Sequence, residues 1–130
     1  MIEITSDTAA HLVTAAGHGK ITGYDYDIVL IPAFEAALKT HKKIRFLYQL
    51  GEDFHGFSAE AVWDDVKLGL GHLTAFEAVA VVTDVVWIAD SVKLLSFFMR
   101  CPVKVFSNAE LGAAREWVVT TPAWRSLAEV

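Results

Sequence analysis

Ala78-Val79-Ala80-Val81-Val82-Thr83-Asp84 is a short and almost uninterrupted apolar run that ends in two polar residues. Such a run is typical of a central parallel β-strand that is covered on both faces. A helical pattern precedes it around 63–72, and a second helix is predicted after it, from about Val86 to Met99. A further β-like run follows at Val103–Phe106. Because strands and helices alternate in this order, the chain is predicted to form an α/β domain.

The first forty residues predict a hairpin and an interrupted helix. Ile2–Ile4 and His11–Ala16 are expected to form two strands, and Gly17–Lys20 either extend the second strand or end it. Tyr24–Thr40 carries apolar residues at helical spacing. Because Pro32 lies inside this segment and removes one backbone donor, a kink or two helical pieces are expected.

The remaining segments complete the predicted sheet. Ile44–Leu50 is expected to be the third strand and Gly51–Phe57 a loop. Ser58 is a good N-cap for a helix that runs to about Leu73, and Asn108 can begin a last helix that runs through Trp117. The predicted fold is therefore one α/β domain at 1–118, with a five-stranded mixed, mostly parallel sheet and about four helices. Residues 119–130 are expected to be a short C-terminal extension.

Composition narrows the classes of function. The chain has 130 residues, a net charge of −5 and scattered basic residues, so no nucleic-acid partner is expected, because phosphate binding needs a basic face. No run of about 18 uncharged apolar residues is present, so no membrane span is expected. The beginning of the chain does not resemble a signal peptide. The single cysteine, Cys101, fits a reducing compartment, and we expect a cytoplasmic protein.

The chain carries no recognisable catalytic or metal-binding constellation. None of the five histidines forms a helical i, i+4 pair. Asp53 and His55 could supply two metal ligands, but nothing specifies a third. Gly17–Lys20 lacks the spacing of a phosphate loop, and no G-x-S-x-G elbow occurs. We therefore expect no enzyme, no metal and no cofactor.

The helix predicted at 86–99 is more apolar than one buried face requires. Asp90 and Lys93 are its only charged residues, and Phe97 falls on the polar side of the helical wheel. Two interpretations follow. The helix either packs between the sheet and a neighbour or lies in a dimer interface, or it lines an apolar pocket or rests on a membrane surface.

The order of these motifs resembles the SpoIIAA-like family, which is related to STAS domains and to the lipid-binding CRAL-TRIO domains. The resemblance covers about 1–118 and rests on the hairpin start and on these segments: 22–26, 31–34, 63–72 and 80–84 with Trp87. It implies an apolar cavity under movable helices, membrane association and dimerisation. In related anti-sigma-factor antagonists a phosphorylated serine lies at the helix start after the third strand. Here Ser58 is available there, without the usual sequence around it.

The leading hypothesis is a non-enzymatic module that binds a lipid-like or small hydrophobic ligand, with a peripheral contact to the membrane surface. Seven residues of the helices at about 59–73 and 86–99 are expected to line its site: Trp63, Val66, Leu70, Trp87, Leu94, Leu95 and Phe98. The alternative is a regulatory protein-interaction domain of the STAS type, with Ser58 as its regulatory residue. A homodimer is expected in either case, because the apolar residues exceed what one small core can hold.

Overall fold

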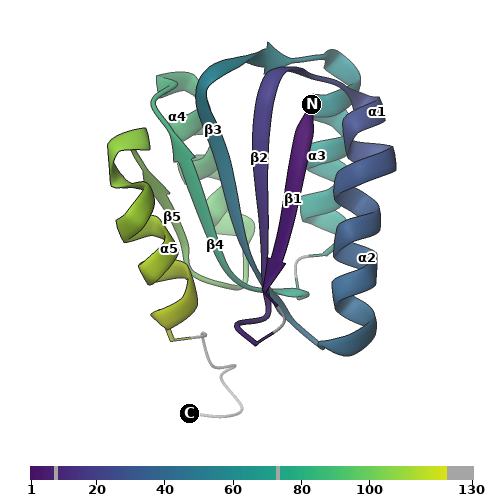
Figure 1. The fold of residues 1–130 in the computed structure, drawn as a ribbon, viewed down its shortest axis with the longest axis vertical. Helices are drawn as coiled ribbons and strands as arrows, with labels where there is room; N and C mark the ends of the chain where they lie inside the picture. Colours follow the sequence, from purple (N-terminus) through teal and green to yellow (C-terminus); the bar gives the residue numbers. More distant parts are fainter. Residues whose placement is uncertain (8, 73, 123–130) are drawn as a thin grey trace.

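A single sheet of five strands, in the spatial order β1-β2-β3-β4-β5, organises the chain (Figure 1). The computed structural model describes residues 1–7, 9–72 and 74–122. The strands are β1 (Ile2–Asp7), β2 (Leu12–Ile21), β3 (Ile44–Phe57), β4 (Phe76–Thr83) and β5 (Val103–Phe106). β1 pairs antiparallel with β2, and every other pair is parallel. The mixed, mostly parallel sheet predicted from the sequence is confirmed.

Helices cover the two faces of this sheet unequally. The helical elements are α1 (Gly23–Asp25), η1 (Tyr26–Leu30), α2 (Ile31–Thr40), α3 (Ala59–Gly71), α4 (Val86–Leu95), η2 (Ser96–Phe98), η3 (Asn108–Glu110) and α5 (Leu111–Thr120). α5 packs on one face, where Ala114 and Val118 join a cluster with Leu47, Ala80 and Val82. The larger core lies on the opposite face, beneath η1, α2, α3 and α4. The alternation along β4 therefore assigns Val79 and Val81 to the larger core and Ala80 and Val82 to α5.

The predicted break in the first helix is confirmed, and it takes the form of a π-helix. Thr22 and Asp25 form a capping box that begins α1. The next five residues form η1, in which the N–H of Ile31 donates to the carbonyl of Tyr26. Pro32 then lies in the first turn of α2, where its missing N–H is tolerated. The wider turn keeps Tyr26 and Leu30 fully buried before the regular helix resumes.

Two predicted boundaries were wrong. Gly51–Phe57, expected to be a loop, continues β3 and pairs with β2 at Gly19–Ile21. The register shifts around Gly19, whose φ of 60° suits glycine, and Gly17–Lys20 therefore extend β2. The apolar helix ends as α4 at Leu95, and η2 follows it. Of the expected extension at 119–130, residues 123–130 lie outside the described part of the chain.

Candidate binding site

A cavity of about 490 Å³ lies on the larger core face, between α3, α4 and the sheet. Its floor is formed by side chains of β3 and β4, among them Phe46, Tyr48, Phe76, Val79 and Val81. α3 supplies Val62 and Val66 to one wall, and α4 supplies Trp87 and Leu95 to the other. The walls are mainly apolar, and the volume falls within the range of small-molecule sites.

Most of the residues predicted to form an apolar site lie on this cavity. Val66, Trp87, Leu94, Leu95 and Phe98 all line it. Trp63 is a correction: its side chain is 62 % exposed and lies beside a different depression, between α1 and α3. The buried apolar residues of α3 are instead Ala61 and Leu68. The side chain of Leu70 lies outside the part that the structure describes.

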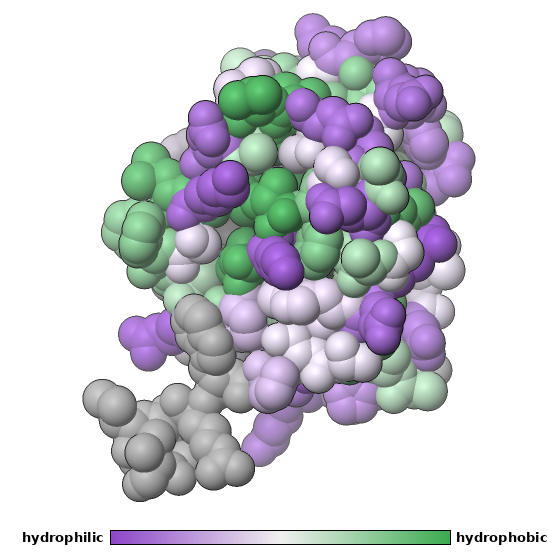
Figure 2. All heavy atoms as spheres, turned by 90° about the vertical axis from the view of Figure 1, so that its left-hand side faces the viewer, coloured by the Kyte–Doolittle hydropathy of each residue, from purple (hydrophilic) through white to green (hydrophobic). Residues whose placement is uncertain are grey.

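The mouth of the cavity is bordered by exposed apolar side chains of α4 and η2. Trp87, Leu94 and Phe98 are each more than half exposed although they line the cavity, and Phe97 beside them is 84 % exposed. Figure 2 views the molecule from the side of α4, β5 and α5 and shows hydrophobic residues gathered over part of this face, with hydrophilic residues among them. An exposed apolar patch of this kind is more often part of an interaction surface than the rest of a protein surface is.

One carboxyl group interrupts the apolar wall. Asp65 of α3 lines the cavity, and its Oδ1 accepts a hydrogen bond of 2.8 Å from the hydroxyl of Tyr26. The hydroxyl of Tyr26 lies 3.0 Å from that of Tyr48, which also lines the cavity. Both tyrosines are buried, whereas Asp65 is accessible because it borders the cavity space. Three polar side chains, from η1, β3 and α3, are therefore linked by hydrogen bonds at the cavity wall.

Burial determines the protonation states of Asp65, Tyr26 and Tyr48. Removal of water by the surrounding protein raises the pKa of the Asp65 carboxyl, and the hydrogen bond from Tyr26 opposes that rise in part. Burial also raises the pKa of both Tyr26 and Tyr48, to which the nearby Asp65 charge contributes. Both phenols consequently stay protonated at neutral pH, and an ionised Asp65 is disfavoured unless a cation or further donors reach it.

Asp65 was not among the residues predicted from the sequence, although a signal was present. It lies four residues after Ala61 and three before Leu68, and both of these are buried. Residues three and four apart share one face of a helix, so Asp65 is an acidic residue, open to the cavity space, on the face that carries two buried apolar residues. An acidic residue in that position points to a specific partner or to a cavity.

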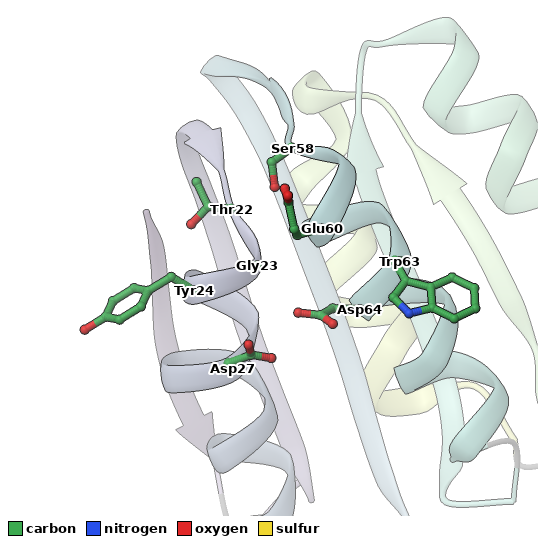
Figure 3. A pocket seen from close by; sticks show the side chains of 8 residues that line it. All are labelled: Thr22, Gly23, Tyr24, Asp27, Ser58, Glu60, Trp63 and Asp64. Atoms are coloured by element: carbon green, nitrogen blue, oxygen red, sulfur yellow. The ribbon is translucent and has the colours of Figure 1, made fainter.

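A second, shallower depression lies between α1 and α3 and is acidic (Figure 3). The two segments approach closely because Gly23 has no side chain: a Cβ there would lie 2.8 Å from the Cβ of Glu60. Figure 3 shows Asp27 and Asp64 on the facing sides of this depression and Trp63 turned away from them. A hydrogen bond with Asp64 raises the pKa of Asp27.

Ser58 lies at the upper end of the same depression, where it caps α3. Its Oγ accepts a 3.1 Å hydrogen bond from the N–H of Ala61. Glu60 and Asp64 line the depression with it, and Lys67 pairs with Asp64 at 3.2 Å. The surroundings of Ser58 are thus dominated by carboxylates, which repel a phosphate group.

The other chemical candidates have structural explanations. Asp53 pairs with His18 at 2.7 Å across the sheet and not with His55. Within 1–7, 9–72 and 74–122, no group of three metal-ligating side chains is found. In the same ranges no helix is long and apolar enough to cross a membrane.

Comparison with known proteins identifies relatives of this architecture. The SpoIIAA-like family model matches residues 12–119, as the motif order had suggested. The chain is also similar to an uncharacterized protein from Shewanella loihica PV-4, of the DUF3478 family, whose crystal structure at 2.25 Å has a SpoIIAA-like fold. That similarity has a TM-score of 0.72 and 28 % identity, and it covers 91 % of this chain and 92 % of the other. No curated protein matches.

Proposed function

Because this chain belongs to the SpoIIAA-like family, we propose that it is a non-enzymatic binding module and that its ligand is a lipid-like or small hydrophobic molecule. The ligand occupies the cavity between α3, α4 and the sheet. The observation that carries the proposal is the cavity itself, which holds about 490 Å³ on the core side of the domain. An empty space of this size is costly to a small fold, since unfilled apolar volume forfeits packing contacts.

The exposed apolar side chains at the cavity mouth suggest how such a ligand enters. Leu94 and Phe98 border the cavity and are each 64 % exposed, so one apolar surface continues from the mouth to the interior. A ligand with low solubility in water transfers most readily from a membrane or another apolar carrier. We therefore propose that α4 and η2 contact the membrane surface transiently. The acidic net charge of −5 favours contact with neutral over anionic lipid.

The alternative is a regulatory protein-interaction domain of the STAS type, which the SpoIIAA-like fold supports in general terms. A phosphoserine switch at Ser58 within that alternative is supported less well. Ser58 is the available serine at the equivalent helix start, but its hydroxyl already caps α3. A phosphate there would face Glu60, Asp64 and Asp27, which line the same depression. The helix N-terminus favours a phosphate, whereas these three carboxylates oppose it.

The test is a fluorescence titration with diphenylhexatriene, an uncharged apolar probe that emits strongly only when it leaves water. The wild-type protein should bind it in a saturable manner. Leu95→Asp places a carboxylate on the cavity wall and should weaken binding by about tenfold or more, because the new charge loses water when a ligand enters. Leu95 is 44 % exposed, so the variant should remain folded, as circular dichroism can show.

Phe97→Asp is the matched control. It introduces the same charge two residues away, at a side chain that is 84 % exposed and is not among the described residues lining the cavity. This variant should bind diphenylhexatriene within about twofold of the wild type, because it adds no charge to the apolar wall. Equal losses in both variants would place the probe on the outer surface, and absence of saturable binding by the wild type would refute the proposal. Native mass spectrometry of gently purified protein provides an independent check, since a retained apolar molecule would appear as added mass.

A further inference from the structure

The hydroxyl groups described on the cavity wall already donate their hydrogens to other groups of the protein. Each hydroxyl carries one hydrogen. Tyr26 donates its own to Asp65, so in the 3.0 Å contact with Tyr48 it is Tyr48 that donates to Tyr26. Ser91 donates to the carbonyl of Trp87 at 2.7 Å, and Ser96 donates to the carbonyl of Lys93 at 2.6 Å. Tyr48, Ser91 and Ser96 therefore present oxygen lone pairs to the cavity, and the ionised form of Asp65 does the same.

Charged donors are also lacking among the described residues that line the cavity. These residues include no lysine, arginine or histidine, and Asp65 carries the single carboxyl group among them. The indole N–H of Trp87 is a side-chain donor on the wall, and Trp87 is 57 % exposed at the start of α4. A ligand that reaches Asp65 and Tyr48 thus meets acceptors, with one carboxylate oxygen, Oδ2, free of the Tyr26 bond.

We propose that the cavity selects apolar molecules with a hydrogen-bond-donating head group, and long-chain amines above all. The inference rests on the proposed function and specifies the ligand of the same site. An ammonium group placed between Asp65 and Tyr48 donates to the Oδ2 of Asp65 and to the Oη of Tyr48, and its charge stabilises the ionised carboxylate. A carboxylate head would meet the lone pairs of the hydroxyl groups and would repel the ionised form of Asp65, so the cavity disfavours fatty-acid anions.

The experiment compares three ligands of equal chain length, decylamine, decanol and decanoate, by isothermal titration calorimetry at pH 7.5. In the wild type, decylamine should bind at least about tenfold more tightly than decanoate, the effect expected of one charge-assisted hydrogen bond. Decanol should bind with intermediate affinity. In Asp65→Asn the amide oxygen can still accept from Tyr26, while the charge is lost, and the preference for the amine should fall to about threefold or less.

Asp90→Asn is the control for general charge. It removes one negative charge from an exposed position on α4 and should leave the order of the three ligands unchanged. A preference lost equally in Asp90→Asn and Asp65→Asn would overturn the inference, because the net charge of the protein would then explain it. Decanoate binding as tightly as decylamine would also overturn it while leaving the proposed function intact. Failure of all three ligands to bind the wild type would instead refute the proposed function.

Discussion

Replacing Val81 by phenylalanine should stabilise the fold, although Val81 is only 6 % exposed and lies within the central part of β4. A larger side chain at a buried strand position ordinarily overpacks the core and costs about 1–3 kcal/mol. Val81 differs because its side chain forms part of the cavity floor, where about 490 Å³ is free. The added ring atoms can therefore enter existing space without displacing neighbours.

The expected gain follows from the volume that the substitution fills. Phenylalanine adds on the order of 50 Å³ to valine, and at about 24 cal/mol per Å³ of removed cavity this corresponds to about 1 kcal/mol. Val82 provides the matched control, because it is the next residue, is 0 % exposed and packs in the cluster beneath α5 with Leu47 and Ala114. Val82→Phe should lose about 1–3 kcal/mol by overpacking.

Urea denaturation followed by circular dichroism measures both free energies of unfolding. The change in the free energy of unfolding should have opposite signs at these two adjacent residues, although the substitution is the same. Val81→Phe should also weaken diphenylhexatriene binding, because the ring occupies ligand space. If Val81→Phe destabilises the protein as much as Val82→Phe does, then α3 and α4 close over the sheet in solution, and the cavity is not open as described.

Three further predictions concern other parts of the fold. The pKa of Asp65 is raised in the folded state, so the folded protein binds this proton more tightly than the unfolded chain does. The stability contributed by the protonated Asp65 is complete below the unfolded pKa. It is lost as pH rises through the folded pKa. Asp65→Asn should therefore be more stable than wild type at neutral pH, with a difference that shrinks toward pH 4 in urea titrations; a constant difference would contradict this. Arg45 donates to the carbonyls of Val118 and Thr121 at 2.8 and 2.7 Å and pairs with Glu77 at 3.1 Å. Arg45→Ala should therefore lower the free energy of unfolding by about 3 kcal/mol and speed hydrogen exchange in α5. Glu77→Gln should have a much smaller effect. Burial raises the pKa of the Cys101 thiol to about 11, so a disulfide reagent at pH 8 should modify native protein far more slowly than protein in urea; equal rates would refute its burial.

The sequence was sufficient for the parts of the fold that depend on local patterns. The apolar run of β4 and the alternation of strands and helices predicted the sheet, because a buried parallel strand has a composition that few other elements share. The extension of β3 through Phe57 was not predictable in this way. Gly51, Asp53 and Gly56 are typical of turns, and here pairing with β2 outweighs that local preference.

Part of the candidate site could likewise be predicted from the sequence, and part of it could not. The unusual apolarity of α4 predicted residues such as Leu95 and Phe98, because surplus apolar surface is visible in composition. Asp65 was missed because its role depends on Tyr26 and Tyr48, which are 39 and 17 positions away in the sequence. Trp63 was misplaced for a geometric reason: an error of one position rotates a residue of α3 by about 100°, enough to turn it from the cavity to the acidic depression.

The π-helix at Tyr26–Leu30 has a consequence for how relatives of this protein are compared. Its wide turn accommodates one more residue than an α-helix would over the same rise, so deleting one residue there would leave both flanking helices intact. The shortened chain would keep the sheet and the capping box of Thr22, with Tyr26 directly after it. A gap of a single position in an alignment of this segment therefore corresponds to loss of the π-turn and not to loss of α1 or α2.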